Sequence, residues 1–237
     1  MMRSATAGTR PASSLANRLR HALGMRQTVV IDGVRYREAR AESLRRALMR
    51  SGSGGKDYVV TFTDGTSMPI RCTVERVYAD LMGPRLLAAV RAADGLIRPG
   101  TRVLLWPAGT GYLASWLSLR LSRSGALVTL EDDEESARYA QRRYPLAGVA
   151  HEHGDTGNLA GETDGAFDAA ISVRNRTVDA VDELNEVWRV TREWLLVGWP
   201  AGERSVVTAL ERLEGVSRRE ELTADGWSLA VAHRDRE

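Results

Sequence analysis

A strand, a glycine turn and a helix start follow one another within residues 102–114, and this segment constrains the fold most. Val103–Trp106 is apolar and predicts a short buried strand, and the turn after it holds Gly109 and Gly111. A helix is expected to begin at about Leu113. Glycine lets a backbone approach a ligand closely, and a helix start offers unpaired N–H donors. The segment therefore predicts a nucleotide-binding loop in an α/β domain.

After this segment, predicted strands and helices alternate as far as the C-terminus. Such alternation predicts a parallel sheet with helices on both faces, which binds ligands at the carboxyl ends of its strands. A closing antiparallel pair is expected near the C-terminus. The predicted strands are 126–130, 148–151, 167–173 and 194–197, the helices 135–143, 178–191 and 206–213, and the closing pair 216–222 with 227–232.

The residues before this domain have a different organisation. Asp32-Gly33 and Asp64-Gly65 predict the tight turns of two hairpins, because these dipeptides supply the positive φ that such turns require. Residues 38–50 are strong helix formers, a flexible Ser/Gly loop follows at 51–55, and another helix is expected from Tyr78. We therefore predict a basic tail at 1–26, a small α+β extension at 27–95 and a Rossmann-like cofactor-binding domain at 96–237.

The positive charge of the chain is concentrated at its N-terminal end. Residues 1–50 hold eleven arginines and three acidic residues, and residues 1–26 hold no acidic residue. Three interpretations fit: a flexible or loosely helical tail, an organelle-targeting segment, and a contact with an anionic partner.

Two negative features narrow the class of protein. No apolar run approaches the ~20 residues that cross a bilayer. Cys72 is the only cysteine, which excludes an internal disulfide and fits a reducing compartment. We expect a cytoplasmic protein without a transmembrane segment.

Acidic residues follow two of the predicted strands. Glu131 lies twenty residues after Gly111, the spacing at which a strand-end carboxylate binds ribose hydroxyls. The alternative is a solvated acidic loop, in which Asp133 and Glu134 cap the next helix. Asp155 is interpreted as an acceptor for a purine amino group, or alternatively as the cap of a short helical turn at 156–160.

Three other sets of polar and aromatic residues can each be interpreted either as part of a functional site or as structural residues. His151 and His153 with Asp155 suggest a metal site, but no further ligand follows at a useful spacing, so no metal is expected. Arg174 and Arg176 either hold an anionic substrate or are solvated. Trp106 and Trp199 stand at strand ends, where they contact a ligand or pack in the core.

Residues 97–200 resemble the class I S-adenosylmethionine-dependent methyltransferase family. The glycine turn looks closest to the protein-isoaspartate branch, but residues 1–95 do not look like that branch, so it implies no substrate. The resemblance implies a mostly parallel seven-stranded sheet and S-adenosylmethionine as cofactor, with an unspecified methyl acceptor. The matching segments are 97–104, Ala108–Ala114, Val128–Glu131, His153–Asp155, Phe167–Ser172 and Val187–Val190.

The resemblance also implies roles for single residues. Gly109 and Gly111 would meet the methionine part of the cofactor, Glu131 its ribose and Asp155 its adenine. No catalytic residue is assigned, because transfer from a sulfonium depends mainly on positioning. Four further residues complete the candidate cofactor site: Ala108, Thr110 and Ser172 of the matching segments, and Asp132, which directly follows one of them.

Two residues depart from the family pattern. Leu105 stands where an acidic residue is usual, and Pro107 where a first glycine is usual and where it removes an N–H donor. The departures predict weakened cofactor binding, or alternatively a catalytically inactive scaffold or partner subunit. A further alternative is an NAD-dependent oxidoreductase, because Gly109-x-Gly111-x-x-Ala114 with Glu131 matches that fingerprint. The basic N-terminal segment also leaves room for a nucleic-acid module.

Overall fold

The computed structural model describes residues 28–31, 33–38, 56–72, 91–121, 124–173, 180–200, 204–224 and 227–235. The chain divides into two compact units, Met1–Arg76 and Val77–Glu237. The tail at 1–26, the loop at 51–55 and the start of the helix expected from Tyr78 lie outside the described residues. The helix expected at 38–50 also lies outside them, except that Glu38 belongs to a strand.

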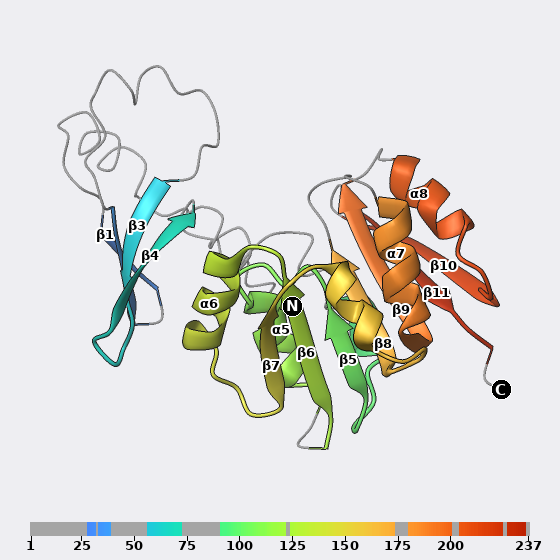
Figure 1. Ribbon diagram of the computed structural model, residues 1–237, viewed down its shortest axis with the longest axis horizontal. Coiled ribbons are helices and arrows are strands. Elements are labelled where there is room, and N and C mark those ends of the chain that lie inside the picture. Colours follow the sequence, from blue (N-terminus) through green and yellow to red (C-terminus); the bar gives the residue numbers. More distant parts are fainter. Residues whose placement is uncertain are drawn as a thin grey trace, which may run out of the picture. The chain divides into compact units, whose positions relative to one another are not determined.

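The first unit contains a four-stranded antiparallel sheet whose strands lie in sequence order (Figure 1). Both expected hairpins are present, and Gly33 and Gly65 at their turns have φ of 80° and 81°. Alternate side chains face opposite sides, so that Tyr36 and Val60 are fully buried while Arg35 and Arg37 are exposed. The strands are β1 (Thr28–Ile31), β2 (Val34–Glu38), β3 (Lys56–Thr61) and β4 (Ser67–Cys72).

The second unit contains a seven-stranded sheet in the order β10-β11-β9-β8-β5-β6-β7 (Figure 1). Strands β5 to β9 pair in parallel, and β11 is antiparallel to both of its neighbours. This confirms the expected mostly parallel sheet with a closing antiparallel pair. The bounds are β5 (Arg102–Leu105), β6 (Ala126–Glu131), β7 (Val149–His153), β8 (Phe167–Val173), β9 (Thr191–Pro200), β10 (Arg218–Ala224) and β11 (Trp227–His233).

Strand β7 runs to His153, two residues beyond its predicted end. It lies at the edge of the sheet, and its last two residues are exposed. An exposed edge strand lacks the continuous apolar run that marks a central parallel strand. The apolar pattern therefore underestimated its length.

Four described helices and one 3₁₀ helix connect these strands. Asp133 caps α6, because its side chain accepts a 2.9 Å hydrogen bond from Ser136 N–H, which confirms the capping interpretation. None of the helices, within the part of the chain that is described, has the length and hydropathy to cross a membrane. The bounds are α5 (Tyr112–Ser118), α6 (Glu134–Arg143), η1 (Thr156–Gly161), α7 (Ala180–Arg189) and α8 (Arg204–Glu211).

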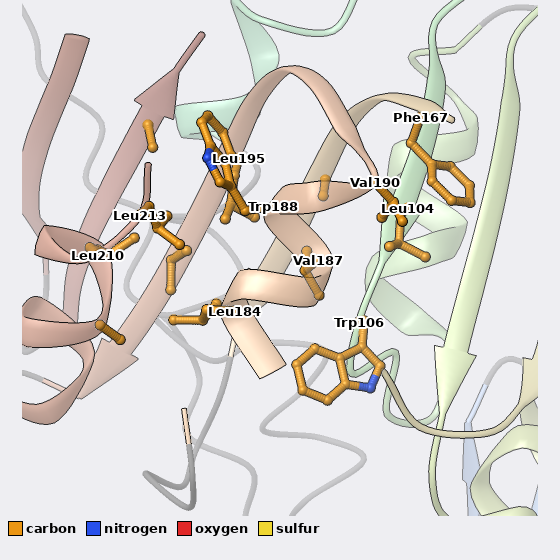
Figure 2. Close-up of a cluster of buried hydrophobic side chains, with 14 of the residues drawn as sticks. Leu104, Trp106, Phe167, Leu184, Val187, Trp188, Val190, Leu195, Leu210 and Leu213 are labelled. Carbon is orange, nitrogen blue, oxygen red and sulfur yellow. The ribbon is translucent and has the colours of Figure 1, made fainter. Parts of the chain in front are cut away.

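The core of the second unit lies in two layers, one on each face of the sheet. Leu104 and Trp106 belong to the layer under α7 and α8, which Figure 2 shows. Val103 and Leu105 belong to the opposite layer, which packs against α5. Helices therefore cover both faces, as expected for a parallel sheet, and the strand ends are left as the place for a ligand.

Candidate functional site

The glycine loop between β5 and α5 is held by backbone hydrogen bonds to both neighbouring strands. Trp106 N–H donates to the Ile171 carbonyl of β8, and Ala108 N–H donates to the Leu130 carbonyl of β6, each at 3.0 Å. The loop therefore lies over the carboxyl ends of the central strands. This is the edge of the sheet that the sequence predicted for a cofactor.

The two glycines of the loop are required for different reasons. Gly111 has φ of 80°, and a Cβ there would lie 2.7 Å from the Ala140 Cβ of α6. It is therefore fixed by helix packing as well as by its backbone conformation. Gly109 has φ of 57°, but a Cβ there would meet no atom within 4 Å. The space next to Gly109 is open, as a loop that receives a ligand requires.

Glu131 ends β6 directly beside this loop. Its side chain is buried, with 7% exposure, and its Oε2 accepts a 2.5 Å hydrogen bond from Gly109 N–H. Its Oε1 accepts a longer bond, of 3.3 Å, from Asp133 N–H. The carboxylate therefore joins the end of β6 to the glycine loop.

Burial raises the pKa of Glu131 to about 7. The Gly109 N–H bond opposes this rise, and neighbouring Asp132 adds to it. Glu131 is thus an acceptor whose charge changes near neutral pH. A ligand that donates hydrogen bonds to its carboxylate favours the ionised form.

A hollow of about 260 Å³ lies at the carboxyl ends of β6 and β7, beginning at Asp132, the residue after Glu131. His153 Nε2 donates a 3.2 Å hydrogen bond to the Asp132 carbonyl, which ties the two strand ends together. Sequence reasoning missed one lining residue, Asn158, whose Oδ1 accepts from Asp155 N–H at 2.9 Å. The three-residue spacing of a capping box was the signal that could have found it. The lining residues are Asp132, His153, Gly154, Asp155 and Asn158.

Asp155 has the capping role that the sequence left open as an alternative. Its Oδ1 accepts a 2.8 Å hydrogen bond from Gly157 N–H at the start of η1. Asp155 also lines the hollow, so that its position at the predicted site and its role as a cap coexist.

His151 is engaged within the protein. Its Nε2 donates to the Tyr144 carbonyl at 3.1 Å, and its Nδ1 then accepts from the Thr129 hydroxyl at 2.9 Å. Burial lowers the pKa of His151, although the Tyr144 carbonyl acts against this. Across the described ranges there is no group of three side chains placed to hold a metal ion.

Of the two family departures, Leu105 lies in the core, whereas Pro107 is half-buried on the loop. Leu105 has no exposed surface, and Trp106 is 5% exposed in the layer shown in Figure 2. Trp199 is buried in the same layer. The packing interpretation of both tryptophans is confirmed.

The remaining candidates differ in their exposure. Ala108 is 7% exposed and Thr110 is half-buried, both on the loop itself. Ser172 has no exposed surface within β8, which separates it from the other candidates. Arg174 and Arg176 lie outside the described residues.

No protein-family model matches the chain, and neither does any curated protein. Solved structures do match. A SAM-dependent methyltransferase from Aquifex aeolicus is 18% identical over 65% of this chain and 92% of its own, with a TM-score of 0.54. A TehB-like SAM-dependent methyltransferase from Corynebacterium glutamicum is 18% identical over 68% of this chain and 95% of its own, with a TM-score of 0.52.

A SAM-dependent O-methyltransferase from Thermotoga maritima is 13% identical, with a TM-score of 0.53. It covers 89% of this chain and 87% of its own, so its match extends into the first unit. Together these similarities show that the second unit has the class I methyltransferase fold. At these identities they show the fold alone.

Proposed function

We propose that the protein is an S-adenosylmethionine-dependent methyltransferase. The observation that carries the proposal is the position of Glu131, a buried carboxylate beside the glycine loop whose next residue, Asp132, lines the hollow. In a fold of this class, that place suits the ribose of the cofactor, whose two hydroxyls donate to a carboxylate.

The residues around Glu131 fit the adenosine part of the cofactor. The hollow offers the carboxylates of Asp132 and Asp155 at the expected adenine end. The space beside Gly109 is open, at the place expected for the methionine end of the cofactor. Ala108, Thr110 and Gly111 form the rest of the loop there. The cofactor supplies a sulfonium methyl group, and the protein has to hold that group in line with an acceptor.

The residues near the glycine loop fit the methionine part of the cofactor less well. Leu105 is packed against α5 and offers no carboxylate to the cofactor ammonium group. An unmade charge-assisted bond of this kind costs roughly 1–3 kcal/mol. We therefore infer weak cofactor binding, with a Kd of about tens of micromolar.

The choice of methyl acceptor is assigned to the extension at 27–95, outside the cofactor-binding domain at 96–237. Segments added to a scaffold commonly carry its specificity. The fold itself does not specify an acceptor.

A second candidate function is a scaffold or partner subunit that keeps the fold without methyl transfer. Two observations favour it: Leu105 is built into the core, and the Glu131 carboxylate is already bonded to Gly109. The two candidates differ in whether the cofactor binds.

Isothermal titration of the full chain with S-adenosylmethionine, S-adenosylhomocysteine and NAD tests the proposal. We expect heat from the first two only. Glu131→Ala should weaken binding by about 1–3 kcal/mol, since charge-assisted bonds to the ribose are lost. His153→Ala should weaken binding less than Glu131→Ala does, because His153 lines the hollow but its ring bonds only the Asp132 carbonyl among the described contacts.

Three outcomes would contradict this reading. Equal losses at Glu131 and His153 would place the ribose elsewhere. Binding of NAD alone would replace the methyltransferase proposal with an oxidoreductase. If none of the three ligands binds, the function supported is the second candidate, a scaffold or partner subunit without methyl transfer.

A further inference from the structure

One face of the N-terminal sheet is buried, whereas the other presents polar and basic side chains. Arg35 and Arg37 are exposed on this second face, and Val59 is 38% exposed between β2 and β4. The register aligns the face in two rows across the four strands. The rows are Val30, Arg35, Thr61 and Ser67, and Thr28, Arg37, Val59 and Pro69.

The guanidinium groups of Arg35 and Arg37 are available to a partner. Neither Arg35 nor Arg37 forms an ion pair within the described part of the first unit. Arg189 of the second unit, by contrast, pairs with Glu186 and Asp164. The two rows contain no acidic residue, and the next pair along the same face is Asp57 opposite Arg71.

The whole first unit is basic, whereas the second is acidic. Met1–Arg76 holds 14 Lys and Arg against 6 Asp and Glu, and Val77–Glu237 holds 19 against 25. The net charges are therefore +8 and −6. An anionic partner is attracted to the first unit and repelled by the second.

We propose that the exposed face of β1 to β4 binds the phosphate backbone of a nucleic acid. Arg35 and Arg37 are two residues apart on one strand, which places them about 7 Å from each other. The Thr61 and Ser67 hydroxyls lie in the same row as Arg35, 2.9 Å apart. Arginine and hydroxyl side chains are the usual partners of nucleic-acid phosphates.

The composition of the face also predicts the mode of binding. Tyr36 and Tyr58 point to the buried side, so the described face offers no aromatic platform for bases. Binding is therefore electrostatic, weakly dependent on base sequence and strongly dependent on salt. Val30 and Val59 lie in different rows and have short side chains, which do not suit insertion into a membrane.

The surface binds nucleic acid whether or not methyl transfer occurs. That the nucleic acid is also the methyl acceptor rests on the proposed function. Measuring RNA binding and cofactor binding on the same proteins separates the nucleic-acid proposal from the methyltransferase proposal.

The test measures the fluorescence anisotropy of a labelled mixed-sequence single-stranded RNA of about 20 nucleotides, titrated with the full chain at several salt concentrations. The double variant Arg35→Glu with Arg37→Glu should weaken RNA binding by more than about tenfold. It should also reduce the slope of log binding constant against log salt concentration by about one to two in magnitude. The matched control, Arg98→Glu with Arg212→Glu, changes two exposed arginines of the second unit and gives the same net charge. It should stay within about twofold of the unchanged protein.

Equal losses in both double variants would overturn the proposal, since only the total charge would then matter. The proposal also fails if the protein binds phosphatidylserine vesicles or polyglutamate but no RNA. Matching melting temperatures show that the variants are folded. S-adenosylhomocysteine binding should be unchanged in Arg35→Glu with Arg37→Glu, and RNA binding without cofactor binding would overturn only the methyltransferase proposal.

Discussion

The two sheets of this protein use their faces in opposite ways. The seven-stranded sheet is covered on both faces, so a ligand can reach it only at the strand ends, where Glu131 and the hollow lie. The four-stranded sheet has one exposed face, with Arg35 and Arg37 upon it. A sheet buried on both faces favours an enclosed site built from loops, whereas a half-exposed sheet leaves a broad surface for a large partner.

The largest expected effect tests this difference in burial directly. Leu105→Glu combined with Pro107→Gly should lower the free energy of unfolding by several kcal/mol, because a carboxylate enters a core with no exposed surface. Val59→Glu is the matched change on the half-exposed sheet, and it should cost less than about 0.5 kcal/mol. Thermal and urea unfolding of both variants measure the two costs.

The same double change tests the cofactor loop. Tighter binding of S-adenosylhomocysteine with stability kept would show that position 105 faces the ligand after all. That result would contradict the packing described above.

A smaller effect distinguishes the two loop glycines. Gly111→Ala should destabilise the protein by about 2–3 kcal/mol, because its Cβ would approach the Ala140 Cβ at 2.7 Å and its φ is positive. Gly109→Ala has the positive φ but open space, and should cost about 1 kcal/mol. Melting temperatures compare the stabilities, and titration calorimetry compares the affinities.

Gly109→Ala should reduce the free energy of cofactor binding by more than it reduces the free energy of unfolding, because the added methyl group occupies the ligand's space. A loss of affinity that merely follows the loss of stability would argue against a ligand at Gly109.

The smallest effect concerns pH. The pKa of Glu131 is raised to about 7, so the stability contributed by its protonated form is fully present below the unfolded pKa near 4.5 and is lost as pH rises through about 7. Ribose binding requires the opposite form, the carboxylate. Affinity for S-adenosylhomocysteine should therefore fall about tenfold between about pH 8 and pH 6.

The Glu131→Gln variant is the control for this pH dependence. It keeps an acceptor for Gly109 N–H without a titrating proton, so its affinity should vary much less over the same range. An equal pH dependence in both proteins would assign the effect to another group.

Much of the architecture was predictable because it depends on local signals. The order of strands and helices followed from apolar periodicity, and both hairpins followed from Asp-Gly turns. The acid that ends β6 was predicted from its spacing to Gly111. The end of edge strand β7 was missed because its last residues are exposed and polar. Central strand β9 also extends three residues beyond each end of the predicted 194–197, since it begins with the polar residues 191–193 and ends with residues 198–200, which include a glycine and a proline.

The sequence by itself determined the alternating domain, the place of the glycine loop and the basic charge of the first unit. Only the tertiary structure decided that Leu105 belongs to the core, that Gly111 faces Ala140, and that the Glu131 carboxylate holds Gly109. The physical reason is the range of the interactions. Turns, caps and periodicity arise between residues close in sequence, whereas burial and carboxylate partners depend on segments that meet only when the sheet has formed.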